Sequence, residues 1–210
     1  QDTGLVPMSP QLLELQWKDF GERPAKVRGF NNDADDARYA SFSNFFEHEP
    51  IPFVIPLYAG HEQLVAAGRP YAVQVRFTEK AIMLCKAAAM GDYERNDKIL
   101  QADTPLKTKR LGRKVKPWDQ PLWDRIVCSL ARAVLIAKAT HLESFRALLL
   151  ATGDDIIAED KSDDVVWGIG IDAGEDDVQT PARWKGTNVF GWALMEARAA
   201  LREASASTGP

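Results

Sequence analysis

Glu79 and Lys86 are the residues whose types and spacing most clearly suggest chemistry. They lie in the stretch Thr78 to Met90, TEKAIMLCKAAAM, where nearly every position after Lys80 is apolar or small except Lys86. On an α-helix, residues seven apart differ by roughly 20° in direction and roughly 10 Å in rise. That separation exceeds the three or four residues of a helix-surface ion pair. The spacing therefore predicts that both side chains face one cleft from its two ends.

The chemistry open to such a pair follows from its surroundings. Burial disfavours the charged form of a lysine, and a neutral lysine is a nucleophile, whereas a glutamate can carry protons. The ordinary alternative is that Glu79 complements the helix dipole and Lys86 extends its ammonium to solvent along an apolar surface. Spacing alone leaves both interpretations open.

The surrounding elements must hold this helix in place. Tyr71 to Phe77 alternates like a strand, and Thr78 is expected to cap the helix that follows it. A long helix is expected from Asp119 through Lys138, and Thr140 to Glu143 has capping-box spacing for the next helix. Further strands are expected at 38–46, 154–159 and 165–167. Further helices are expected at 93–101, from Pro105 onward, and at 189–203, where Asn188 is the expected cap. Gly153 is expected to end the helix before it. The pattern predicts a single, mostly helical α+β domain with a small β-sheet.

Composition narrows the class of protein. The chain has 210 residues, of which 45% are hydrophobic and 27% charged, as in ordinary globular proteins. No apolar run approaches the roughly 20 residues that cross a bilayer. Two cysteines and three scattered histidines form no metal-ligand spacing, so we expect no metal and no cofactor. We expect an intracellular location, cytoplasmic or nuclear, because the cysteines form no disulfide framework.

Charge is unevenly distributed. Lys107 to Lys116, KTKRLGRKVK, has six basic residues in ten, whereas the segment 154–177 is strongly acidic. A basic run next to an aromatic residue such as Trp118 can hold phosphates, and a solvated charged face is the alternative.

An ordered set of motifs gives the chain a family resemblance. In order, these are SNF at 43–45, the Glu79/Lys86 helix, LGR at 111–113, Trp123, RALLLAT at 146–152, DVVWG at 164–168 and GTNVFGWALMEAR at 186–198. Together they resemble the NADAR, or YbiA-like, family over roughly residues 38 to 203. The segments between Asn44 and Glu79 and between Gly168 and Gly186 are longer than usual in that family. The resemblance divides the chain into an N-terminal extension (1–37), a NADAR/YbiA-like catalytic domain (38–204) and a disordered tail (205–210).

The resemblance implies hydrolysis of an N-glycosidic bond between a phosphorylated ribose and an amino-substituted heterocycle. It implies Lys86 as nucleophile or sugar anchor, Glu79 as general acid and base, and Asp164 as a residue that binds ribose or assists water. The positions expected to bind substrate are Asn44, Phe45, Gly112, Arg113, Trp123, Trp167, Gly168 and Asn188. Among these, Arg113 and the backbone at Asn188 are expected to hold phosphates.

Three functions fit this pattern. The first is removal of ADP-ribose from a nucleobase, most readily guanine in DNA, so that the partners are an ADP-ribose-containing substrate and ADP-ribosylated DNA. The second is cleavage of ribosylaminopyrimidine intermediates of the riboflavin pathway. The third is a module that binds ADP-ribose or NAD without turnover. The basic run at 107–116 favours the first function, and the presence of both Glu79 and Lys86 argues against the third.

Overall fold

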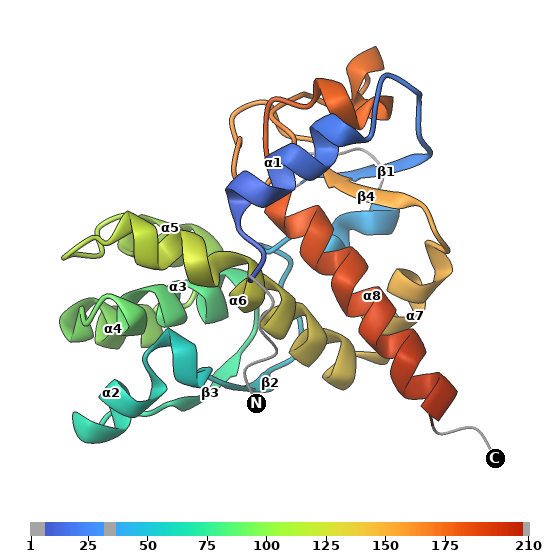
Figure 1. Ribbon diagram of the computed structural model, residues 1–210. Coiled ribbons are helices and arrows are strands. Elements are labelled where there is room, and N and C mark those ends of the chain that lie inside the picture. The colour runs from blue at the N-terminus through green and yellow to red at the C-terminus, as the bar shows by residue number, and fades with distance from the viewer. Residues whose placement is uncertain (1–6, 32–36, 208–210) are drawn as a thin grey trace.

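Helices dominate the computed structural model, which describes residues 7–31 and 37–207 (Figure 1). The α-helices are α1 (Pro10–Asp19), α2 (His61–Ala66), α3 (Thr78–Ala89), α4 (Tyr93–Leu100), α5 (Pro105–Gly112), α6 (Gln120–His141), α7 (Glu143–Ala151) and α8 (Val189–Ser207). The strands are β1 (Val27–Phe30), β2 (Ile51–Val54), β3 (Ala72–Val75) and β4 (Ile156–Glu159). The expected mostly helical α+β domain is confirmed, and none of the described helices is long and apolar enough to cross a bilayer.

The strands form two small sheets, where the sequence predicted one. β1 and β4 pair in parallel, with Val27 opposite Ile156 and Phe30 opposite Glu159. β2 and β3 pair antiparallel, with Ile51 opposite Val75. In Figure 1 the β2–β3 sheet lies with α2 to α5, and the β1–β4 sheet lies with α1 and α8. The two sheets thus belong to opposite sides of the molecule.

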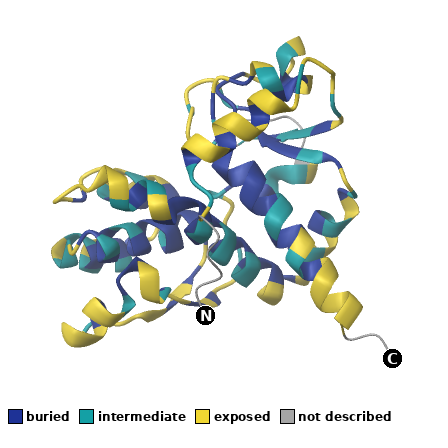
Figure 2. Ribbon diagram, viewed as in Figure 1, coloured by how far each residue is buried: buried dark blue, intermediate teal, exposed yellow. Residues whose placement is uncertain are grey.

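α6 and α8 form the centre of the core. Leu130, Val134 and Leu135 of α6 are almost wholly buried, as are Phe190 and Leu194 of α8. α3 packs against α4, α5 and α6, and Figure 2 shows that the central helices are mostly buried while the outer helices expose one face. Burial of α3 follows from its apolar sequence, because a helix that is apolar all round has no face suited to water.

Residues 7–30 pack into the same body as the rest of the described chain. Trp17 of α1 is buried, its ring centroid lies 5.0 Å from that of Trp184, and its Nε1–H donates to the Thr187 carbonyl at 2.8 Å. β1 completes a sheet with β4. The segment expected to be an extension therefore contributes both a strand and a buried anchor to the fold.

Several expected elements differ in the structure. Residues 38–46 form no strand, because Ala37–Phe42 is a 3-10 helix followed by a turn at Asn44. Residues 165–167 are a bend rather than a strand, since the Val165 and Val166 carbonyls accept amides from Thr187 and Val189 instead of from a neighbouring strand. Residues 205–207 continue α8, so the tail expected to be disordered is helical there, and 208–210 lie outside the described residues.

Thr78 and Thr140 do not cap the helices that they were expected to cap. α3 begins at Thr78 itself, and the buried Thr78 hydroxyl has no partner among the described residues. At the second site, α6 continues to His141, so the Thr140 hydroxyl donates back to the Ile136 carbonyl at 2.8 Å and does not cap α7. By contrast, α5 begins at Pro105 as predicted, and the Asp119 carboxylate caps α6 by accepting from the Leu122 amide at 2.9 Å.

Candidate active site

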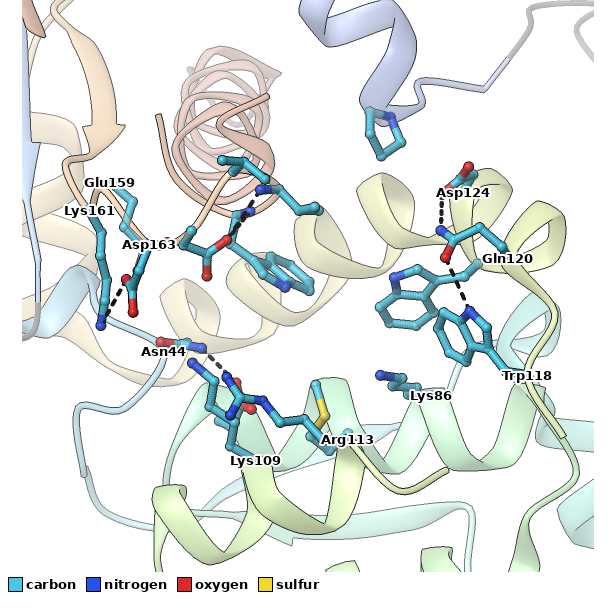
Figure 3. A pocket seen from close by; sticks show the side chains of 18 of the residues that line it. Asn44, Lys86, Lys109, Arg113, Trp118, Gln120, Asp124, Glu159, Lys161 and Asp163 are labelled. Atoms are coloured by element: carbon cyan, nitrogen blue, oxygen red, sulfur yellow. Dashed lines mark hydrogen bonds and ion pairs between the residues drawn. The ribbon is translucent and has the colours of Figure 1, made fainter. Parts of the chain in front are cut away.

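A cavity of about 660 Å³ lies between α3 and α5 on one side and the segment after β4, α6 and α1 on the other (Figure 3). Its volume falls within the range of about 300–1,000 Å³ that is usual for small-molecule sites. Glu79 and Lys86 both line it, as the helical spacing predicted, and Met83 lies on the wall between them. Ile82, which was expected beside Met83, is fully buried in the core.

Glu79 is held at the cavity by the turn that carries Asn44. The Asn44 side-chain amide donates to Glu79 Oε2 at 2.6 Å, and the Glu79 backbone N–H donates to the Asn44 carbonyl at 2.9 Å. Burial raises the pKa of Glu79 to about 7, although the positive charge of Lys109, the Asn44 hydrogen bond and Lys86 all act to lower it. A carboxyl group with this pKa can both accept and donate a proton near neutral pH.

Lys86 faces the aromatic end of the cavity. Its Nζ lies 4.5 Å from the ring centroid of Trp118 and 5.5 Å from that of Trp123. Burial lowers the pKa of Lys86, the charge of Glu79 acts to raise it, and Arg113 acts to lower it further. The tryptophan faces attract the ammonium form, so they oppose the effect of burial. Among the described residues, Lys86 Nζ forms no hydrogen bond and no ion pair, which leaves it available to a ligand.

α5 brings cationic side chains to the cavity. Lys109 and Arg113 line it, and neither forms an ion pair with a described residue. Gly112 does not line the cavity: a Cβ there would lie 1.9 Å from Met83 Sδ, so this glycine lets α5 pack closely on α3. Phe45 is also absent from the wall, and Lys109 Nζ lies 5.3 Å from the centroid of its ring. Gly112 and Phe45 therefore pack against Met83 and Lys109, which line the cavity, and their expected substrate contacts stay predictions.

Asp164 and Glu159 add two further carboxyl groups to the cavity. Asp164 Oδ1 accepts the amides of Val166 and Trp167 at 3.2 and 2.8 Å, which fixes the turn that brings Trp167 onto the wall. Glu159, which the sequence analysis missed, is 5% exposed at the end of β4. Burial, with the nearby charge of Asp164, raises the pKa of Glu159 to about 8.

Asn188 and Gly168 support this arrangement from behind the wall. Asn188 is fully buried, its Oδ1 accepts the Glu159 amide at 3.1 Å, and its Nδ2 donates to the Ile157 carbonyl at 2.9 Å. The backbone amides of residues 188–190 donate to the carbonyls of residues 166–168, and the phosphate site expected at this helix end stays a prediction. Gly168 is buried, and a Cβ there would lie 2.6 Å from the Glu159 carbonyl oxygen. Both residues hold the end of β4, and neither lines the cavity.

The arrangement combines proton carriers, a potential nucleophile, cations and aromatic faces in one cavity. Carboxyl groups whose pKa values differ can divide the roles of acid and base between them. Lys109 and Arg113 can bind phosphate oxygens, and the rings of Trp118, Trp123 and Trp167 can stack on a heterocycle. Within the described chain, no cluster of three or more metal-binding side chains is placed to hold a metal ion. The absence of a cofactor stays a prediction.

Comparison with known proteins shows the family to which the chain belongs. The NADAR domain matches residues 30–202. The chain belongs to the NADAR domain family. The match contains α3, α5, α6, β4 and α8, and it leaves α1 outside.

Individual NADAR relatives agree with this membership. Over 168 residues the chain is 28% identical to the protein irg-1 of Caenorhabditis elegans, covering 76% of this chain and 74% of that protein. Over 121 residues it is 31% identical to an N-glycosidase of Acanthamoeba polyphaga mimivirus, covering 57% of this chain and 71% of the relative. The NMR structure of the Escherichia coli protein YbiA superposes with a TM-score of 0.63 at 24% identity, covering 90% of this chain and 92% of that one. The last comparison shows that the fold is YbiA-like.

Proposed function

We propose that this chain is an N-glycosidase that removes ADP-ribose from a nucleobase, with guanine in DNA as the base. The observation that carries the proposal is the pairing of Glu79, whose pKa is raised to about 7, with Lys86, whose pKa is lowered, on the wall of one cavity. The mimivirus relative is named as an N-glycosidase, which supports the reaction class.

In the first mechanism Lys86 is the nucleophile. Opening of the ribose ring converts the N-glycoside of an exocyclic amine into an imine at C1, and the neutral Lys86 amine adds to that carbon. The bond from C1 to the heterocyclic nitrogen then breaks as Glu79 donates a proton to the leaving amine, which leaves a Schiff base between Lys86 and the sugar. Water adds to C1 with Glu79 as base, and collapse of this adduct releases the sugar and restores the amine.

In the second mechanism Lys86 stays charged and anchors the sugar or a phosphate. A carboxylate of the cavity, Glu79 or Asp164, activates water for direct attack at C1, while a protonated carboxyl group donates to the leaving nitrogen. The contact of Lys86 Nζ with two tryptophan faces supports this version, because such faces stabilise an ammonium. Glu159, with a pKa raised to about 8, is suited to be the proton donor.

Borohydride reduction separates the two mechanisms. Reduction during turnover converts a Schiff base into a stable secondary amine, so the first mechanism predicts a protein–sugar adduct at Lys86, located by peptide mass spectrometry. Wild-type enzyme that turns over substrate without any trapped adduct would leave the second mechanism standing.

The distribution of charge supports a phosphorylated substrate attached to nucleic acid. Lys109 and Arg113 line the cavity beside Lys86, where they can bind the diphosphate of ADP-ribose. Arg110 and Lys114 are exposed beside them on and just after α5, outside the cavity wall, where they can contact a DNA backbone.

The direct test is incubation of the purified protein with an oligonucleotide that carries ADP-ribose on guanine. We expect release of ADP-ribose and recovery of unmodified guanine, both measured by mass spectrometry. If the oligonucleotide stays intact while a phosphoribosyl aminopyrimidine is cleaved, the substrate assignment is wrong and the reaction class stands. If both stay intact and ADP-ribose binds in a calorimeter, the chain is a binding module.

A further inference from the structure

α1 lines the cavity although it lies outside the NADAR match. The match begins at residue 30, and α1 spans Pro10–Asp19. Pro10 and Gln11, at the start of the helix, form part of the cavity wall. The helix is fixed there by Leu13 and Trp17, which are buried, and by the bond from Trp17 Nε1 to the Thr187 carbonyl. This part of the wall therefore comes from residues outside the matched domain.

A chain of hydrogen bonds connects α1 to the aromatic end of the cavity, and Figure 3 shows the part that runs from Asp124 through Gln120 to Trp118. Asp124 on α6 accepts Gln11 Nε2 at Oδ2, at 2.8 Å, and Gln120 Nε2 at Oδ1, at 2.7 Å. Gln120 Oε1 in turn accepts the Trp118 indole N–H at 3.1 Å. All four residues line the cavity, and the Trp118 ring covers Lys86 Nζ. The position of Gln11 is thus linked to the ring that lies beside Lys86.

Oxygen atoms of Asp124 and Gln11 in this hydrogen-bonded series can accept further hydrogen bonds from a ligand. A carboxylate has about four lone-pair sites, and the two amide donors occupy only two of those on Asp124. Gln11 Oε1 accepts no hydrogen bond from a described residue. Beside the face of Trp118, these oxygens match a flat heterocycle that presents amine and ring N–H donors along one edge. An amino-substituted lactam, such as the base of guanine or a 2-aminopyrimidinone, has that edge.

We infer that Gln11, Asp124 and Gln120 form the subsite for the leaving heterocycle, and that α1 gives this chain its selectivity for a leaving group with a donor edge. This inference rests on the proposed function, because only a substrate that is cleaved has a leaving group. The subsite itself can be tested by binding alone. The cationic side chains of α5 then contact the phosphorylated part of the substrate. Gln11 and Asp124 are specificity-determining residues in this account.

The experiment compares two small heterocycles with the same ring. Isocytosine (2-aminopyrimidin-4-one) carries the amine, whereas pyrimidin-4-one lacks it. Ligand-observed NMR titration of the full chain is expected to show that wild type binds isocytosine about tenfold more tightly, which is the usual effect of one or two hydrogen bonds. Gln11→Ala and Asp124→Ala are expected to abolish this preference. Gln16→Ala is the matched control, because Gln16 is an exposed glutamine of the same helix that does not line the cavity.

The outcomes separate the subsite from the proposed function. A preference that is absent in wild type, or that is equal in wild type, Gln11→Ala and Asp124→Ala, overturns the subsite. If those variants lose the preference and Gln16→Ala keeps it, the subsite is supported even where the ADP-ribosylated oligonucleotide stays intact, and the proposed function alone falls. If the oligonucleotide is cleaved and the preference never depends on Gln11 or Asp124, the function stands without the subsite.

Discussion

Lys86 and Lys138 are two lysines in apolar helices, and burial lowers the pKa of both. Lys138 on α6 is 1% exposed, its Nζ donates to the Ser41 carbonyl at 2.6 Å, and it lies 4.7 Å from the Phe145 ring. Lys86 also contacts aromatic rings, but it faces a cavity lined by several carboxyl groups, and no described residue hydrogen-bonds to its Nζ.

The difference shows that a lowered lysine pKa does not by itself mark a site. Burial lowers the pKa of Lys138 to about 7, yet its Nζ already donates to the Ser41 carbonyl inside the core. Lys86 becomes a candidate because open space, the carboxyl group of Glu79 and the cationic side chains of Lys109 and Arg113 lie on the same cavity. Perturbed ionisation points to function when it coincides with a cleft.

The same substitution at both lysines gives the largest expected contrast. Lys86→Met is expected to lower kcat/KM on the ADP-ribosylated oligonucleotide about a thousandfold, as loss of a group that acts on the reacting carbon does. Lys138→Met is expected to change kcat/KM by less than about fivefold, because Lys138 does not line the cavity. Circular dichroism of both variants checks that they fold. Equal losses in the two variants would mean that Lys86 has no special role.

Glu159→Gln tests the carboxyl group that only the structure revealed. With the pKa of Glu79 raised to about 7 and that of Glu159 to about 8, an ionised Glu79 and a protonated Glu159 coexist best between these values. Wild-type kcat/KM is therefore expected to rise with pH through about 7 and fall above about 8. Glutamine has no proton to lose, so kcat/KM of the variant should no longer fall at alkaline pH. Its kcat/KM should also be about a hundredfold lower than that of wild type. An unchanged alkaline limb would assign that limb to another group.

Asn44→Ala tests the residue that holds Glu79. The Asn44 hydrogen bond favours the ionised form of Glu79, so its loss should raise the pKa of Glu79 further. We expect the acidic limb of the pH profile to move to higher pH and kcat/KM at pH 6.5 to fall about tenfold, the cost of one charged hydrogen bond. The loss should shrink at pH 8. A loss that is the same at every pH would indicate that Asn44 acts on the substrate and not through Glu79.

The smallest expected effect concerns stability at Lys138. Its pKa is about 7 in the folded chain and near 10.5 when exposed, so the unfolded chain binds more protons between these values. The contribution of Lys138 to stability therefore rises with pH above about 7 and is lost as pH falls through about 7. In urea unfolding, wild type should gain about 1 kcal/mol more than Lys138→Met between pH 7 and pH 8. Parallel curves for the two proteins would show that Lys138 stays charged in the core.

The sequence predicted the features that depend on local patterns. The apolar run around Lys86 predicted α3, and the seven-residue spacing placed Glu79 and Lys86 on one cavity. Pro105 and Asp119 marked the starts of α5 and α6, because proline and a capping aspartate act within one turn of their position. The family was also predictable, since its motifs occur in order along the chain.

What the sequence could not show depends on distant contacts. Glu159 lies among ten acidic residues between 154 and 177, and nothing local distinguishes it from solvated neighbours. It reaches the cavity because β4 pairs with β1 and because Asn188 holds its amide. Asn188 was misread for the same reason: an asparagine before a helix predicts a cap, but its side chain bonds to β4 instead. The contribution of α1 depends on a contact between residues 11 and 124.

The most direct test of the central claim is the single-turnover rate of Glu79→Gln on the ADP-ribosylated guanine oligonucleotide, measured beside wild type at pH 7.5. Glu79→Gln keeps the size of the side chain and its hydrogen-bonding capacity toward Asn44 while removing the group that carries protons. We expect wild type to cleave the oligonucleotide and the folded variant to have a single-turnover rate about a thousandfold lower. Cleavage by the variant within about threefold of wild type would contradict the assignment of this cavity as the catalytic site.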